Sequence, residues 1–147
     1  MFIKGVDLKQ SYRTRKVNQP PQFTNFKPRG IPQKHLKRTE LYIDEFEAIR
    51  LADYCSMDHQ QAAEQMQISR PTFTRLIKKA RQKIATMLNE GMELIISGGN
   101  FELSNTLYHC RDCGETTRIP LYLKSDNCLE CGSENVDDLA DKLTNKL

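Results

Sequence analysis

The 147-residue sequence has no long apolar segment and no internal repeat, and its only biased stretch is a basic one near the N-terminus. A membrane-spanning helix needs about 20 predominantly apolar residues, so none is expected. The polar, basic N-terminus also lacks the pattern of a secretory signal peptide. We therefore predict a soluble cytoplasmic protein without a membrane partner.

Motifs typical of enzymes are also missing. The sequence has no glycine-rich phosphate loop, no pair of carboxylates beside a plausible base, and only three histidines. Asp44, Glu45 and Glu47 are acidic enough for a metal site. They are better explained as first-turn helix residues, which the helix dipole favours. We therefore predict that the protein is not an enzyme.

Residues 69–88 have the pattern of an amphipathic helix with a basic outer face. Apolar residues recur at spacings of three and four, which at 3.6 residues per turn places them on one side. These residues are Phe73, Leu76, Ile77, Ala80, Ile84, Met87 and Leu88. The opposite side carries Arg75, Lys78, Lys79 and Gln82, with Thr74 beside them. Ser69 can cap the first turn, where Pro71 is tolerated because the first amides have no partners within the helix.

A shorter helix is expected just before it, beginning at Asp58. Asp58 and Gln61 can form a capping box, and Ala62 and Ala63 are small enough for two steeply crossing helices to approach. Gln67 occupies the turn, where glycine is commonest and a positive φ is costly for other residues. The pattern predicts a helix-turn-helix whose second helix enters the major groove of DNA. The alternative is an ordinary helical hairpin whose Lys and Arg side chains are only solvated.

A third helix is expected within residues 41–57, with Asp44 as its cap and Glu47 three residues on. Cys55, near its end, is expected to be a small buried residue. Three helices ending in a basic one predict a mainly α fold, a helix-turn-helix three-helix bundle.

Two resemblances support this interpretation. The DNA-binding helices of region 4 of bacterial sigma factors are similar to the segments DEFEAIRLADY, QAAEQM and ISRPTFTRLIKKARQKIA. With FKPRGIP at residues 26–32 and GMELIISGG at residues 91–99, the chain resembles uncharacterised protein family 0251, a prokaryotic family of predicted DNA-binding proteins. The resemblance covers roughly residues 23–99. It implies a helix-turn-helix and a DNA-binding role, but no established activity; this chain departs from it in a longer N-terminus and in Gln67.

Charge is strongly segregated along the chain. Residues 1–38 contain ten Lys or Arg and one Asp, a net charge of +9, whereas residues 39–58 have a net charge of −5. Residues 59–97 have a net charge of +3 and residues 98–147 a net charge of −4. The basic segments could face phosphate, and the acidic C-terminal third would be repelled by it.

The N-terminal arm is short of apolar residues and carries Arg13, Arg15 and Lys16 ahead of two prolines. An extended arm of this kind could follow the DNA backbone or enter a minor groove; the alternative is a solvated terminus. Four apolar residues that follow are expected to pack against the bundle. They are Phe23, Phe26, Ile31 and Leu36.

The C-terminal third contains two Cys-x-x-Cys pairs separated by fourteen residues, each followed by glycine. The four cysteines are Cys110, Cys113, Cys128 and Cys131. This spacing suits a tetrahedral site joined by a short β-hairpin, and resembles a zinc ribbon. A segment of about 30 residues is too small to fold without metal, disulfides or a partner. The absence of a signal peptide and the odd number of cysteines favour a metal over disulfides, with zinc ahead of iron.

Four thiolates fill a tetrahedral zinc ion, so the predicted site is structural or regulatory and not hydrolytic. Because the ribbon is acidic, it is expected to contact a protein, stabilise a dimer or sense metal. Closing residues Val136, Leu139, Leu143 and Leu147 fall on one side of a possible short helix.

The predicted organisation has five parts: a basic arm (1–22), a helix-turn-helix domain (23–97), a linker (98–105), a zinc ribbon (106–136) and a tail or short helix (137–147). We predict a sequence-specific regulator of transcription that binds double-stranded DNA. The alternatives are a module that docks on RNA polymerase or another protein through the ribbon, and a metal or redox sensor; a homodimer is possible. The expected DNA contacts are Arg13, Arg15, Lys16, Ser69, Arg70, Thr72, Thr74, Arg75, Lys78 and Lys79.

Overall fold

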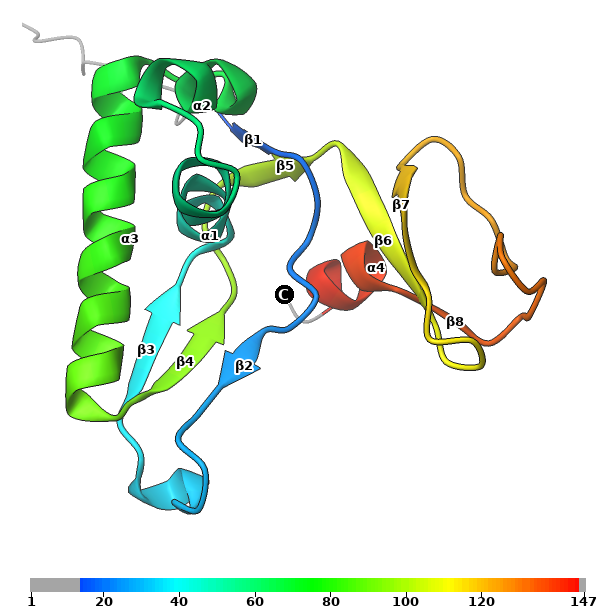
Figure 1. Ribbon diagram of the computed structural model, residues 1–147, viewed down its shortest axis with the longest axis horizontal. Helices are drawn as coiled ribbons and strands as arrows, with labels where there is room; N and C mark the ends of the chain where they lie inside the picture. Colours follow the sequence, from blue (N-terminus) through cyan, green and yellow to red (C-terminus); the bar gives the residue numbers. More distant parts are fainter. Residues whose placement is uncertain (1–13, 146–147) are drawn as a thin grey trace, which may run out of the picture.

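The computed structural model describes residues 14–145 (Figure 1). Its strands form three small sheets. In the first, β1 (Arg15–Val17) pairs in parallel with β5 (Phe101–Leu103). In the second, β4 (Glu93–Ile96) lies between antiparallel β2 (Asn25–Phe26) and parallel β3 (Arg38–Leu41). In the third, antiparallel, sheet β6 (Asn105–Cys110) lies between β7 (Thr116–Pro120) and β8 (Val136–Asp138).

The helices are η1 (Gln33–His35), α1 (Ile43–Ile49), the π-helical turn η2 (Arg50–Tyr54), α2 (His59–Met66), α3 (Arg70–Glu90) and α4 (Leu139–Thr144). The prediction of a mainly α fold is wrong, because three sheets accompany these helices and the fold is α+β. The strands are two to six residues long, and several pair with strands distant in sequence. Such short segments carry too few residues for an alternating pattern to be recognised.

Helices α1, α2 and α3 and the turn η2 share one apolar core (Figure 1). Phe73, Ile77 and Leu76 of α3 face Ala62 and Ala63 of α2, and all five are buried. The two alanines allow the close approach of α2 to α3 that the sequence predicted. A second core lies where the C-terminal half of α3 covers the β2–β4–β3 sheet. It contains Val17, Leu41, Ile43, Ala80, Leu94 and Ile96.

The helix N-termini are mostly as the sequence predicts. Asp58 accepts a hydrogen bond from the Gln61 amide at 2.8 Å, and the Gln61 side chain accepts from the Asp58 amide at 3.3 Å. Ser69 accepts from the Thr72 amide at 3.3 Å. Gln67 ends α2 in the left-handed region, with φ of 54°. The capping box, the Ser69 cap and the positive φ at Gln67 are confirmed.

Replacing Gln67 by glycine is expected to raise the free energy of unfolding by about 0.5–1 kcal/mol, because glycine adopts this backbone conformation without a Cβ clash. Chemical denaturation measures the difference. The matched control is Gln65→Gly, at an exposed position inside α2. There glycine should lower stability by about 1 kcal/mol. Equal effects of the two substitutions would contradict the backbone explanation.

The expected cap of the first helix is wrong. Helix α1 begins at Ile43, one residue after Tyr42, and Asp44 lies inside its first turn. Asp44, Glu45 and Glu47 are all buried. Asp44 pairs with Arg15, and Glu45 and Glu47 pair with Lys83 at 2.7 Å and Arg50 at 2.8 Å. Asp44 and Glu45 therefore join α1 to β1 and α3 through ion pairs, whereas the Glu47 pair lies within the α1–η2 segment.

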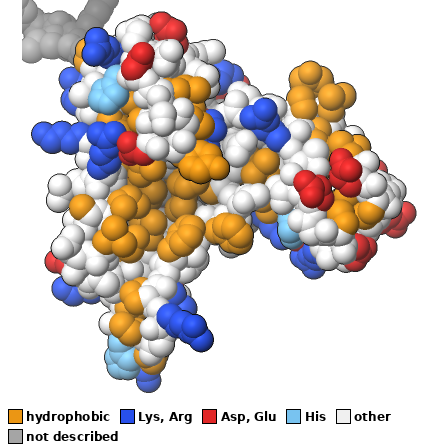
Figure 2. Space-filling model, viewed as in Figure 1, with side chains coloured by type: hydrophobic (Ala, Val, Ile, Leu, Met, Phe, Trp, Pro, Cys, Tyr) orange, Lys and Arg blue, Asp and Glu red, His pale blue; other side chains and the backbone are white. Residues whose placement is uncertain are grey.

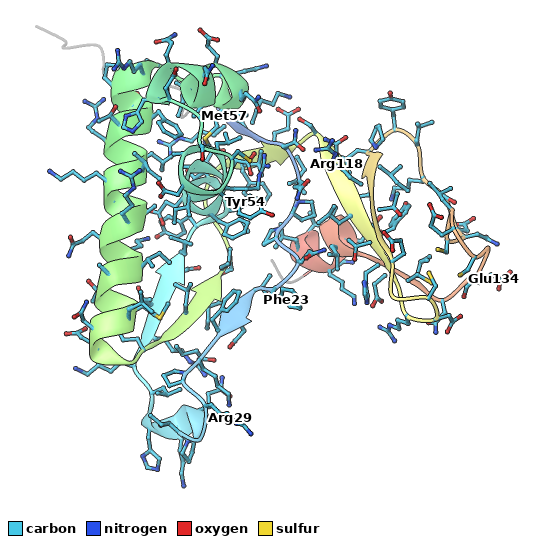
Figure 3. The ribbon with its side chains drawn as sticks, in the orientation of Figure 1. Phe23, Arg29, Tyr54, Met57, Arg118 and Glu134 are labelled. Carbon is cyan, nitrogen blue, oxygen red and sulfur yellow. The ribbon has the colours of Figure 1, made fainter. Side chains whose placement is uncertain are left out.

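Two predictions of burial are also wrong. Phe23, Phe26 and Ile31 are exposed by 68%, 46% and 42%, and Cys55 is exposed. Phe23 follows β1 and Phe26 lies in β2, an edge strand, so the bundle does not cover either (Figure 3). Cys55 follows the π-helical turn, which shifts the helical register at the end of the segment. The hydrophobicity of these residues alone reveals neither the edge position of β2 nor the π-helical turn before Cys55.

The third sheet contains a hairpin, β6–β7, with Pro120 at the end of an edge strand. The hairpin predicted between the two cysteine pairs is therefore displaced, because β7 pairs with the strand before the first pair and ends at Pro120. Val136 belongs to β8, so the closing helix starts only at Leu139. Leu143 of α4 packs against the second core and thereby links the ends of the described chain. Strand β5 lies within the expected linker. Across residues 14–145, no helix is long and apolar enough to cross a membrane.

Candidate nucleic-acid interface and metal centre

The outward face of α3 is basic and open to solvent (Figure 2). Arg70, Arg75, Lys78 and Lys79 are exposed, as is Thr74, while Thr72 is partly buried. Burial of Phe73, Leu76, Ile77 and Ala80 fixes the rotation of the helix and turns the basic side chains outward. The predicted amphipathic pattern is confirmed from Phe73 to Met87, but Leu88, predicted to belong to the apolar side, is 69% exposed.

A cavity of about 820 Å³ opens beside the N-terminal half of α3. Its lining includes Arg75 and Lys79 together with Tyr42, and Ser69 and Thr72 at the start of the helix. The Lys83 ammonium lies 4.1 Å from the centre of the Tyr42 ring, and the Lys79 ammonium lies 6.0 Å from it. An aromatic ring therefore positions cations at the edge of this cavity.

Some of the predicted contact residues already have partners. Ser69 and Thr72 share a hydrogen bond of 2.8 Å between their hydroxyl oxygens. Thr74 Oγ1 lies 2.9 Å from His59 Nδ1, and the His59 ring packs edge-on against Phe73 at 5.3 Å. His59 and Tyr42 are residues that the sequence analysis did not include in the interface. No spacing motif marked them, since each is placed by tertiary contacts.

The N-terminal arm is only partly described, because Arg13 lies outside residues 14–145. Arg15 and Lys16 belong to β1. Arg15 pairs with buried Asp44, and Lys16 pairs with Glu102 at 2.7 Å. These two cations therefore have intramolecular partners, whereas Arg70, Arg75, Lys78 and Lys79 of α3 form no ion pair within residues 14–145.

The pairing of cations follows a clear pattern within residues 14–145. Nine Lys and Arg side chains there form ion pairs, and nine do not. Eight of the nine without ion pairs lie in two groups, the outward face of α3 and the loop of residues 27–37. They are Arg70, Arg75, Lys78 and Lys79 in the first group and Lys27, Arg29, Lys34 and Lys37 in the second. Positive charge is thus left uncompensated in two defined places.

The four predicted cysteines come together in the third sheet and its loops. Their sulfur atoms all lie within 4.8 Å of one another, with Cys110 Sγ 3.6 Å from Cys131 Sγ and Cys113 Sγ 3.7 Å from Cys128 Sγ. Four sulfurs bound tetrahedrally to one ion at about 2.3 Å are about 3.8 Å apart. The cluster therefore has the size of a tetrahedral thiolate site and could hold a metal ion.

The two cysteine pairs fold alike. The Gly114 amide donates to the Cys110 carbonyl at 3.0 Å, and the Gly132 amide donates to the Cys128 carbonyl at 2.9 Å. Both glycines have positive φ, 77° and 73°, which the tight turns require. Asp112 joins the two turns by accepting hydrogen bonds from Ser133 and Asn135.

Protons are unevenly held in the cluster. The Cys113 amide donates to Cys110 Sγ at 3.5 Å, which lowers the pKa of Cys110 to about 7. At Cys113 the Glu115 amide favours the thiolate, but desolvation and the neighbouring thiols outweigh it and raise the pKa of Cys113 to about 12. The Cys110 thiol therefore ionises readily, whereas ionisation of the Cys113 thiol is disfavoured. A bound metal cation would favour the thiolate form of both. His109 bonds to Thr116 at 3.0 Å and is not in the cluster.

Comparisons with known proteins agree with one another. A family model described as "Protein of unknown function DUF134" matches residues 7–104, ending before the four cysteines. A UPF0251 protein of Chloroherpeton thalassium is 49% identical over 132 residues, which cover 90% of this chain and 87% of the relative. A UPF0251 protein of Pelotomaculum thermopropionicum is 48% identical over 69% of this chain and 77% of the relative. A UPF0251 protein of Halothermothrix orenii is 36% identical over 86% of this chain and 96% of the relative.

Proposed function

The chain belongs to the uncharacterised family DUF134, or UPF0251, and we propose that this member is a sequence-specific DNA-binding protein that regulates transcription. In this proposal α2 and α3 act as a helix-turn-helix resembling that of sigma-factor region 4. The role is one of binding and not of catalysis. Double-stranded DNA is the proposed partner.

The pattern of cation pairing carries the proposal. Two other cations of α3 are matched with carboxylates, in the pairs Arg81–Asp53 at 2.7 Å and Lys83–Glu45 at 2.7 Å. The cations on the outward face of α3 have no such partners among residues 14–145. Four uncompensated charges on one exposed helix face suit a polyanion, and the helix diameter suits the major groove.

Position on the helix suggests a division of roles. Arg75 is proposed to read a base, because a guanidinium can donate two parallel hydrogen bonds to a guanine edge. Lys78 and Lys79 lie about one turn further along α3 and are proposed to bind phosphates. Thr74, held by His59, and Arg70 complete the proposed contact surface.

The four-cysteine cluster is proposed to bind zinc as a structural ion. Cys110, Cys113, Cys128 and Cys131 would supply every ligand of a tetrahedral ion, leaving no open position for a reacting water. Iron has the same ligand preference in a four-thiolate site and is the alternative. The ion would tie β6 to the loops on either side of it.

A second candidate function is docking on another protein of the transcription machinery through the third sheet. Four large apolar residues are exposed in the segment after β7 and in the second cysteine pair: Leu121, Tyr122, Leu123 and Leu129. Exposed apolar groups within an acidic segment favour a protein partner over DNA. This contact is compatible with DNA binding by α3.

Selection of bound duplexes from a random pool, with and without a metal chelator, tests the proposal. We expect the wild-type protein to enrich one motif. A palindromic motif would indicate that two copies bind. Enrichment of no motif, with binding of partner proteins retained, would contradict DNA reading and favour the docking function. A motif that is enriched only without chelator would favour metal sensing.

A further inference from the structure

The second group of unpaired cations lies far from the recognition face of α3. Residues 27–37, here called the basic loop, contain Lys27, Arg29, Lys34 and Lys37, and no acidic residue. All four cations are exposed, and Figure 3 shows Arg29 at the lower end of the molecule. Figure 2 shows blue and pale blue side chains gathered on this lobe, separate from those beside α3.

The basic loop is held in place by one buried carboxylate. Glu93 of β4 is fully buried and accepts hydrogen bonds from Asn25 at 2.7 Å, Gln33 at 2.9 Å and Arg38 at 2.8 Å. The Asn25 hydrogen bond, with those of Arg38 and Gln33, lowers the pKa of Glu93, so this carboxylate stays ionised. Glu93 fixes both ends and the helical turn of the loop, but neutralises only Arg38.

The loop lies at the C-terminal end of α3. The Glu93 amide donates to the Lys37 carbonyl at 2.8 Å, and a methyl group at Gly91 would lie 4.0 Å from Pro28. Between Arg75 and the end of α3 at Glu90 the helix rises about 22 Å, at about 1.5 Å per residue. This distance exceeds the width of the major groove, about 12 Å, so the loop lies beyond the bases that Arg75 is proposed to contact.

From this placement we infer that the basic loop binds DNA phosphates outside the motif read by α3. The inference rests on the proposed DNA binding and extends its footprint. The loop is fixed and carries four uncompensated cations. It can therefore contact a DNA backbone without the entropic cost that ordering a flexible loop would require. Its contribution is independent of sequence, because phosphates carry no base identity.

The double variant Arg29→Gln/Lys34→Gln tests the inference. It removes two positive charges from the basic loop and keeps the hydrogen bonds to Glu93, because neither Arg29 nor Lys34 donates to that carboxylate. Affinity for the selected duplex with long flanks is measured across salt concentrations. The slope of log affinity against log salt should fall by about 1.8, and affinity near 0.1 M salt by roughly 60-fold, with the selected motif unchanged. On a duplex trimmed to the motif, variant and wild type should bind alike.

The matched control is Arg118→Gln/Lys124→Gln, which removes the same charge from exposed positions in the acidic third. It should keep the wild-type slope. A loop variant that matches this control on the long duplex overturns the inference and leaves DNA reading by α3 intact. Loss of binding to vesicles of anionic phospholipid, with DNA affinity unchanged, also overturns it, in favour of a membrane contact. If the wild-type protein binds no duplex, the proposed function fails and the inference with it.

Discussion

Replacing Arg75 by alanine is expected to weaken binding to the selected duplex by about 10- to 100-fold, the loss of one bidentate base contact. Arg75 is exposed on α3, lies beside the cavity at its N-terminal half, and forms no ion pair within residues 14–145. Its removal should therefore cost little stability. Discrimination at one position of the motif should relax, which competition between single-base variants of the duplex measures.

Lys79→Ala separates a phosphate contact from a base contact. Affinity should fall evenly for all duplexes, and the salt slope should fall by about 0.9. Arg118→Ala, which removes an exposed cation from β7, serves as the control and should change neither quantity.

Unchanged affinity and base preference in Arg75→Ala would show that this helix face does not read the motif.

Removing the proposed metal ion is expected to unfold the third sheet. Structural zinc in small peptides contributes about 10 kcal/mol or more, and a unit of this size has little other core. Cys128→Ser, which replaces a buried member of the cluster, should release the ion and abolish the dispersed amide signals of β6, β7 and β8. Metal analysis of the purified protein and nuclear magnetic resonance spectra measure both effects.

Cys55→Ser is the matched control, because Cys55 is exposed and lies outside the cluster. It should retain the metal and the spectrum. A Cys128→Ser protein with an intact third sheet would contradict a structural role for the ion. If the sheet unfolds while DNA affinity stays constant, metal sensing is excluded; a large change in affinity would favour it.

Local patterns predicted local structure well. The apolar stripe from Phe73 to Met87, the Asp58 capping box and the Ser69 cap each depend on residues within a few positions, and each is found in the structure. The cysteine spacing likewise predicted which sulfurs meet. In these cases the interacting groups lie on one helix, or on two similar turns that β7 and the segment after it connect.

Long-range pairing was not predicted, and it accounts for the errors. The parallel pairs β1–β5 and β3–β4 join segments more than 50 residues apart, so no local periodicity indicates them. Asp44 was expected to cap a helix but pairs with Arg15 from β1, a partner visible only after folding. The basic loop was not identified as a separate binding surface for the same reason. What distinguishes its four cations is that no carboxylate pairs with them among the described residues, which only the folded structure shows.

DNA reading by α3 can be tested by titrating the labelled protein with the selected duplex and following its backbone amide signals. We expect the largest changes at residues 69–82, smaller ones in the basic loop, and little change in β6, β7 and β8. The largest changes in the third sheet, or none anywhere at saturating duplex, would show that α3 does not read DNA.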